Sequence, residues 1–333
     1  MTKIIVLTPV KNEAWILDRF LQVCSAFADH IIIADQNSTD GSLEIYPKYP
    51  KVTLILNNNP QYDEAERQLL LLNTARTKFG INNILIAIDA DEILAADAML
   101  SKDWTRMLSA SPGTVLYFEK PTFYKNTSLV IRYFSGGWPL GYVDDGAEHK
   151  PSVIHSTRIP TPLHANKIYL EDIKFLHYAL IRLDAQASKQ RMYSMLENIN
   201  QTKSLRLRLR HYNSNMDFSK EGSRHEASNH AWFKNWEEQG IDMHEVNHSE
   251  HYWYDYECLK LFERYGTFRF MFDDVWKFDW ENFQMQTDEQ SYVCVPKTLI
   301  KPPYPLLREV VSKCFHIIDK CVLKLQTTKQ GFK

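Results

Sequence analysis

The sequence has no long apolar run: no stretch of eighteen consecutive apolar residues occurs anywhere in its 333 residues. A helix that crosses a bilayer needs about 20 such residues, so we expect no membrane-spanning segment. The apolar stretch near the N-terminus is also too short for an export signal. We therefore expect a protein of the cytoplasm.

Cysteine pairs and an excess of one charge are missing too. The five cysteines are scattered and none forms a CxxC pair, which argues against a disulfide framework and a zinc cluster. The 39 Lys and Arg residues nearly balance 41 Asp and Glu residues, giving a formal net charge of −2. This charge exerts no general attraction on nucleic acid, so we expect no nucleic-acid partner and local binding of any anionic ligand.

Two glycine-rich phosphate motifs are absent. No GxGxxG pattern follows the first apolar run, and neither GxxxxGKS nor GxxxxGKT occurs anywhere. These absences argue against a Rossmann dinucleotide site and a P-loop. The length and the 44% hydrophobic content fit either a single large domain or one catalytic domain with an appended subdomain.

The first 95 residues alternate short β-rich apolar runs with amphipathic stretches. This rhythm predicts a parallel sheet with helices on both faces. Strands are expected at residues 3–10, 30–35, 52–56 and 83–88, with a long helix at 63–79. After about residue 110 the pattern becomes hairpin-like, and helical spacing is expected again over 171–210.

The fourth expected strand runs directly into Asp89-Ala90-Asp91-Glu92, which contains a DxD motif. Extended geometry places Asp89 and Asp91 on the same side. Ligands of parallel sheets bind beyond the carboxyl ends of the strands, where two adjacent carboxylates favour a hard divalent cation. The alternative is a helix N-cap followed by acids that the helix dipole favours.

Two other strand ends present polar groups to the same edge of the sheet. One carries the residues TPVKNE, numbers 8–13, and the other carries DQNSTDGS, numbers 35–42. Three converging strand ends are more specific than the DxD motif alone, and the loop amides can face the same crevice.

These residues resemble the GT-A glycosyltransferases, particularly the family 2-like enzymes, and the resemblance covers residues 3–95 well. It implies a three-layer α/β/α sandwich over residues 1–215, with the nucleotide-sugar half in 1–95 and the acceptor half in 96–215. A mixed, largely helical extension follows over 216–333. The resemblance further implies binding of a nucleotide-diphosphate sugar by Thr8, Pro9, Val10, Asn12, Glu13, Asp35, Ser38, Arg67, Asp89 and Ala90.

In that resemblance Pro9, Val10 and Glu13 border the nucleoside, and Asp35 contacts the base. Arg67 corresponds to an arginine near the nucleotide, with a solvated helix face as the alternative. The expected metal is Mn²⁺ or Mg²⁺, held by Asp89, Asp91 and His177. His155 is a weaker substitute for His177, and a satisfied core histidine is the alternative for His177.

Transfer with inversion needs a base that takes the proton of the acceptor hydroxyl, and the segment 138–149 offers three acids. We favour Asp145, then Glu148, then Asp144, against the alternative of a solvated acidic turn. The resemblance thus implies transfer of a sugar, with UDP-hexose favoured, to a saccharide or lipid-linked acceptor in cell-envelope polysaccharide or lipopolysaccharide synthesis. Sugar-nucleotide nucleotidyl transfer and an inactive nucleotide-binding module are the alternatives.

Three further segments have two interpretations each. The tail 301–333 is a basic amphipathic helix, either a peripheral anchor on the cytoplasmic face of a membrane or a helix docked on its own core. The basic run 203–210 fits either an edge strand or a helix. Its cations either bind an anionic acceptor or form a solvated face that nearby acids neutralise. The aromatic residues of 230–256 fit either stacking on sugar rings or a core.

Overall fold

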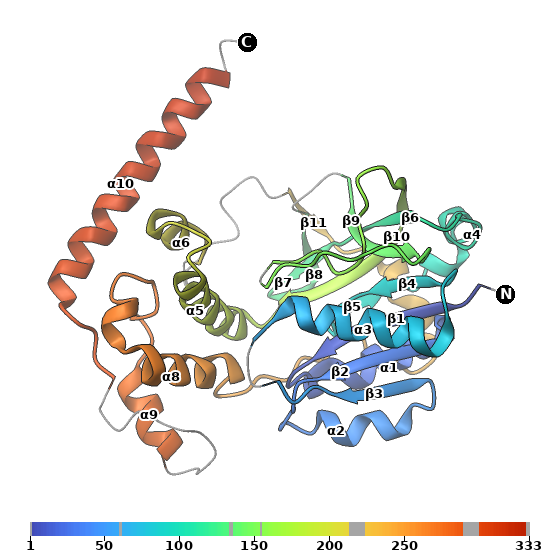
Figure 1. Cartoon of the computed structure of the whole chain (residues 1–333), viewed down its shortest axis with the longest axis horizontal. Helices are drawn as coiled ribbons and strands as arrows, with labels where there is room; N and C mark the ends of the chain where they lie inside the picture. Colours follow the sequence, from blue (N-terminus) through green and yellow to red (C-terminus); the bar gives the residue numbers. More distant parts are fainter. Residues whose placement is uncertain are drawn as a thin grey trace. The chain divides into compact units, whose positions relative to one another are not determined.

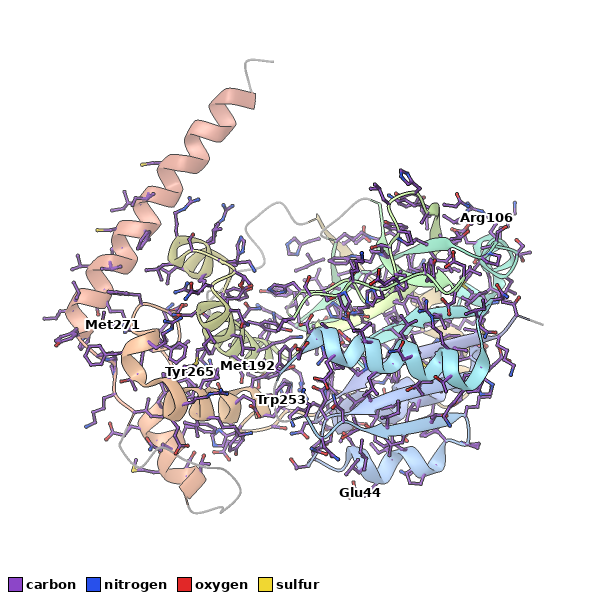
Figure 2. All side chains as sticks on the ribbon, in the orientation of Figure 1. Glu44, Arg106, Met192, Trp253, Tyr265 and Met271 are labelled. Atoms are coloured by element: carbon purple, nitrogen blue, oxygen red, sulfur yellow. The ribbon has the colours of Figure 1, made fainter. Side chains whose placement is uncertain are left out.

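The computed structural model describes residues 2–59, 62–132, 136–153, 155–212, 224–288 and 300–330 (Figure 1). Figure 2 shows the side chains whose placement the structure describes. The chain divides into two compact units, Met1–Arg182 with Ser219–His248, and Leu183–Phe218 with Ser249–Lys333. The functional division expected at about residue 215 stays a prediction.

Four parallel strands form one half of the sheet in the first unit. In spatial order they are β3 (Val52–Leu56), β2 (His30–Asp35), β1 (Ile4–Val10) and β4 (Ile84–Ala87). All four lie where the sequence predicts strands. We call the edge at which these strands end the carboxyl edge, and the opposite edge the amino edge.

The other half of the sheet is mixed. β9 (Trp138–Val143) lies antiparallel between β4 and β6 (Thr114–Glu119), and β10 (Asn166–Leu180) pairs in parallel with β6. The remaining strands are β7 (Thr122–Tyr124), β8 (Asn126–Arg132), β11 (Arg224–Ala227) and β5 (Glu92–Leu94), the last paired antiparallel with β10.

The helical spacing expected from residue 171 was wrong for its first part. β10 runs to Leu180, and α5 (Leu183–Asn200) begins only there. The last residues of β10 are rich in aromatic and branched side chains, and they pair with β5 and β7 at once, so sheet pairing outweighs the apparent helical period.

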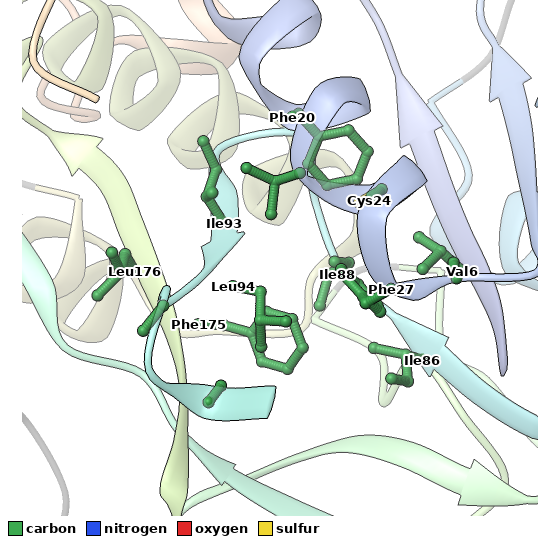
Figure 3. Packing of buried hydrophobic residues seen from close by; sticks show 14 of the residues in the cluster. Val6, Phe20, Cys24, Phe27, Ile86, Ile88, Ile93, Leu94, Phe175 and Leu176 are labelled. Atoms are coloured by element: carbon green, nitrogen blue, oxygen red, sulfur yellow. The ribbon is translucent and has the colours of Figure 1, made fainter. Parts of the chain in front are cut away.

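The two faces of the parallel strands are covered by different helices because side chains alternate along a strand. Val6 and Ile86 pack with α1 (Ala14–Phe27) on one face, where Phe20 and Cys24 are buried (Figure 3). On the other face, neighbouring strand residues pack against α3 (Glu64–Phe79) through Leu71, Leu72 and Ala75. This is the predicted three-layer α/β/α arrangement.

Short helices complete the first unit, and helices make up the described part of the second. The first unit contains α2 (Ser42–Ile45), α4 (Lys102–Leu108), α7 (Lys234–Glu238) and 3-10 turns at Tyr46–Lys48, Ala98–Leu100 and His230–Trp232. The second contains α5, α6 (Leu205–His211), α8 (Trp253–Tyr265), a 3-10 turn at Thr267–Phe270, α9 (Trp280–Asp288) and α10 (Pro305–Gln330). None of these described helices is long and apolar enough to cross a membrane.

The structure decides between the two interpretations for parts of the basic run 203–210 and of the aromatic segment 230–256. The run 203–210 is mostly helical, and Arg208 donates to buried Asp273 at 2.7 Å while Lys203 pairs with buried Glu197. Two of its cations are therefore neutralised by acids. In the aromatic segment, Trp232 and Trp236 are buried, as the core interpretation expects.

Candidate functional site

Three strand ends meet at the carboxyl edge. The pairing of β1 with β4 places Leu7 opposite Ala87, and the pairing of β1 with β2 places Val10 opposite Asp35. The DxD motif begins two residues beyond Ala87, so it lies at the same edge as both polar loops. The structure thus brings together the three segments that the sequence analysis expects to converge.

Asp35 organises the loop after β2 from inside. Its side chain is 0% exposed; Oδ1 accepts from the Ser38 amide at 2.8 Å, and Oδ2 accepts from the Tyr46 hydroxyl at 2.6 Å. Ser38 Oγ in turn accepts from the Asn12 amide at 2.9 Å, and Asn12 Oδ1 accepts from the Thr39 amide at 2.7 Å. Asp35 therefore fixes the loop, while its expected contact with a base stays a prediction.

The loop after β1 is shaped for a close approach of its backbone to the loop after β2. Asn12 has φ 54° and Asn37 has φ 55°, in the left-handed region that asparagine tolerates better than most residues. The Glu13 amide donates to Ser42 Oγ at 3.2 Å, and the Ala14 amide donates to Asp40 Oδ2 at 2.8 Å. The two loops thus form one rim at the carboxyl edge.

Arg67 reaches this rim from the first turn of α3. Its Nη1 lies 3.4 Å from Gln36 Oε1, and its guanidinium lies 5.3 Å from the centre of the Tyr62 ring. The side chain is half-buried and faces the loop after β2, so the structure does not support a fully solvated helix face. Thr8 and Val10 are buried, whereas Pro9 is half-buried.

The two acids of the DxD motif, Asp89 and Asp91, belong to a charged cluster. Its other members are Glu92, Lys120 and Arg158. Glu92 is 0% exposed, and its Oε2 accepts from Arg158 Nη1 at 2.5 Å while its Oε1 accepts from Lys120 Nζ at 2.9 Å. Arg158 Nη2 also donates to Asp89 Oδ2 at 2.5 Å. Glu92 and Arg158 form a forked pair, the strong form of charge-assisted hydrogen bonding.

The charges of this cluster stabilise one another. Burial raises the pKa of Glu92, but Arg158, Lys120 and His177 together hold that pKa well below its usual value. Burial lowers the pKa of Arg158, but Asp89, Glu92 and Asp91 raise it above its ordinary value. Both Glu92 and Arg158 are therefore charged near neutral pH.

Asp91 lies beside His177 on the other side of the motif. Asp91 Oδ2 is 3.7 Å from His177 Nε2, and His177 Nδ1 is 3.2 Å from Thr122 Oγ1. A carboxylate oxygen and an imidazole nitrogen at this spacing fit two positions around a divalent ion such as Mn²⁺. Asp89 is already paired with Arg158, and no group of three His, Cys, Asp or Glu ligands assembles within the part of the chain that the structure describes.

The acids favoured as base lie elsewhere. Because β9 is antiparallel to β4, Val143 pairs with Ile84 at the start of that strand, which puts the following acids at the amino edge. Asp144 is buried and binds Arg76 at 2.7 Å, and Asp145 accepts from the Tyr142 hydroxyl at 2.5 Å. Glu148 is an exposed residue near Lys150. The structure does not bring Asp144, Asp145 or Glu148 together with the DxD motif.

A sheet whose parallel strand ends carry two polar loops and a DxD motif, with helices on both faces, has the GT-A type of fold. Residues 5–154 match the family model for glycosyl transferase family 2. This match confirms the resemblance predicted from the sequence and the expectation of a glycosyltransferase of the family 2 type. No curated protein matches the chain.

Several solved structures are similar over part of the chain. A 4-diphosphocytidyl-2C-methyl-D-erythritol synthase matches at 15% identity and a TM-score of 0.28, covering 35% of this chain and 60% of its own. A nucleotidyl transferase from Methanothermobacter thermautotroptrophicus matches at 14% identity and a TM-score of 0.27, covering 38% of this chain and 68% of its own. Glucosyl-3-phosphoglycerate synthase from Mycobacterium tuberculosis, in complex with Mn²⁺, UDP and glucosyl-3-phosphoglycerate, matches at 16% identity and a TM-score of 0.26. This match covers 37% of this chain and 44% of the synthase chain.

Four residues at this edge were given no role from the sequence. Gln36 lies within the polar segment 35–42 and Glu92 directly follows the DxD motif, so the motifs themselves carried a signal for both. Lys120 and Arg158 are distant in sequence and stand in no recognisable pattern. Only the fold shows that they reach Glu92.

Proposed function

We propose that this protein is a metal-assisted, inverting glycosyltransferase that moves a sugar from a nucleotide-diphosphate donor, with UDP-hexose favoured. The acceptor is a saccharide or a lipid-linked molecule, in cell-envelope polysaccharide or lipopolysaccharide synthesis. The observation that carries the proposal is the meeting of Asp91 and His177 at the carboxyl edge, beside the two loops. The family match over residues 5–154 supports the same reaction class.

In this proposal the loops after β1 and β2 bind the nucleoside, and Asp91 with His177 holds Mn²⁺ or Mg²⁺. When bound, such an ion neutralises the charge that develops on the leaving diphosphate. The acceptor oxygen forms the new bond to the anomeric carbon while the bond from that carbon to the diphosphate oxygen breaks. The proton of the acceptor hydroxyl passes to a base, for which Asp145 and Glu148 are unsuited because they lie at the amino edge.

Release of nucleoside diphosphate from UDP-hexoses in the presence of Mn²⁺ tests this proposal. Wild-type protein should release UDP, Asp91→Ala should lose that activity, and the exposed Asp172→Ala should keep it. Exchange of pyrophosphate into a nucleoside triphosphate would indicate nucleotidyl transfer instead. Nucleotide binding without either reaction would indicate an inactive binding module.

We also propose that α10 holds the protein at an anionic membrane surface on the cytoplasmic side. Leu306, Val310 and Ile317 share one side of the helix and are 81%, 58% and 61% exposed. Residues 301–333 contain seven Lys and Arg residues against two acids, which complements anionic headgroups. An apolar face with flanking cations is the pattern of an interfacial helix.

Flotation with vesicles tests this contact. The protein should float with phosphatidylglycerol vesicles and stay behind with phosphatidylcholine vesicles, and Ile317→Glu should abolish flotation. As a control, Leu100→Glu replaces a leucine outside α10 that is 88% exposed, more than the 61% of Ile317, and should float like wild type. Equal behaviour with both lipids would contradict the charge argument.

A further inference from the structure

Arg158 occupies the position beside Asp89 at which the DxD motif is expected to face a cation. Its Nη2 donates to Asp89 Oδ2 at 2.5 Å, and its side chain is largely buried while that of Asp89 is 35% exposed. The guanidinium therefore covers one oxygen of Asp89 from the protein side. An arginine held there competes with any divalent ion for the same carboxylate.

Glu92 anchors this arrangement. It is fully buried and accepts from Arg158 with both oxygens, at 2.5 Å and 3.1 Å, while Oε1 also accepts from Lys120 at 2.9 Å. The Lys120 ammonium lies 4.2 Å from the centre of the Trp138 ring. A buried carboxylate that binds two cations is suited to holding those cations in place rather than to binding a ligand.

The net charge of the cluster favours binding of a divalent cation first and of an anion after it. Its three carboxylates face two cations, so the cluster has one net negative charge when His177 is neutral. A divalent ion at Asp91 reverses the sign of the net charge to positive. A diphosphate, which is anionic, then finds a complementary site.

We propose that Arg158 is a resident counter-cation shared between Asp89 and the donor diphosphate. It neutralises Asp89 in the empty site and donates to phosphate oxygens in the occupied site. This inference rests on the proposed function, because it requires a diphosphate and a divalent ion at the carboxyl edge. It goes further by making Arg158 responsible for the coupling between the two ligands.

Two consequences of opposite sign follow for Arg158→Met. The divalent ion alone should bind more tightly, because the competing cation beside Asp89 is gone. UDP alone should bind more weakly, because a charge-assisted donor to phosphate is lost. The factor by which Mn²⁺ tightens UDP binding, which must equal the factor by which UDP tightens Mn²⁺ binding, should change as well.

Calorimetric titration with Mn²⁺ alone, UDP alone and UDP in saturating Mn²⁺ tests the inference on wild type, Arg158→Met and Arg158→Lys. We expect Mn²⁺ alone to bind Arg158→Met about tenfold tighter or more, and UDP alone about tenfold weaker. Arg158→Lys keeps a cation and should stay near wild type for Mn²⁺ alone. Arg106→Met is the control, since Arg106 lies on α4 (Figure 2), where it pairs with Asp103 and donates to the Tyr169 carbonyl at 3.4 Å.

Circular dichroism establishes that each variant is folded. If Arg158→Met does not fold, Arg158→Gln replaces it, because glutamine can still donate to Glu92. Unchanged Mn²⁺ affinity in the neutral variant, or weaker binding of both ligands, overturns the role of Arg158 and leaves the proposed function intact. A wild-type protein that binds no UDP with or without Mn²⁺ overturns the proposed function and this inference together.

Discussion

Asp91 Oδ2 lies 3.7 Å from His177 Nε2, although Asp91 immediately precedes β5 and His177 lies within β10, far away in the sequence. The pairing of β5 with β10 accounts for this, because it places His177 opposite Glu92, next to Asp91. The amide of Tyr178 also donates to the Asp91 carbonyl at 2.8 Å. The backbone therefore holds the two residues next to each other.

His177→Gln should weaken the gain in UDP affinity that Mn²⁺ provides, because an imidazole ligand is lost while the strand pairing is kept. We expect a loss of about tenfold or more in that gain, measured by calorimetry. His164→Gln, at an exposed position, should behave like wild type. An undiminished gain in His177→Gln would show that this imidazole does not hold the ion.

Asp145→Asn and Glu148→Gln should each keep the rate of UDP release within about twofold of wild type, because both residues lie at the amino edge. Initial rates with a UDP-hexose and Mn²⁺ measure this. A loss of several orders of magnitude in either variant would support the base role that the sequence suggested and contradict the separation of the two edges.

Tyr46→Phe should destabilise the protein by about 1–3 kcal/mol, because the buried Oδ2 of Asp35 loses its donor. Urea unfolding measures this. UDP affinity should fall less than in Asp35→Asn, since Ser38 still donates to Oδ1 in Tyr46→Phe. Wild-type stability in Tyr46→Phe would mean that this hydrogen bond does not hold the loop.

His149 should make the protein less stable in mild acid. Burial lowers the pKa of His149 from 6.5, Arg76 lowers it further, and the backbone of Thr157 raises it. The unfolded chain therefore takes up this proton at higher pH than the folded chain. The stability from neutral His149 is complete above pH 6.5 and is lost as pH falls from there toward the folded pKa.

Melting temperatures measured between about pH 7.5 and pH 5.5 test whether stability falls with pH in this direction. The two pH limits lie about one unit on either side of the ordinary histidine pKa. His149→Gln cannot take up the proton, so its melting temperature should fall less over this interval than that of wild type. Equal falls in the two proteins would contradict the assignment to His149.

The parallel half of the sheet was predictable because each strand is a short apolar run that ends in polar loop residues. The pattern 83–88 followed by Asp89 and Asp91 gave both the strand and the edge at which the acids lie. Side-chain alternation in these strands, with different faces covered by α1 and α3, follows from the same local signal.

The amino-edge acids and Arg158 were not predictable in this way. The direction of β9 decides where Asp145 lies, and an isolated run of residues reads the same in a parallel or an antiparallel strand. Arg158 reaches Asp89 only because the chain passes beside the start of α3, where the Ser156 amide donates to Glu64. Such long-range contacts have no period or motif in the sequence.

The most direct test is calorimetric titration of UDP into wild-type protein and Asp91→Ala, each with Mn²⁺ and with EDTA. If Asp91 holds the ion that meets the diphosphate, Mn²⁺ should tighten UDP binding to wild type by about tenfold or more, and Asp91→Ala should lose this gain. The same UDP affinity with Mn²⁺ and EDTA in wild type, or a full gain in Asp91→Ala, would contradict the site.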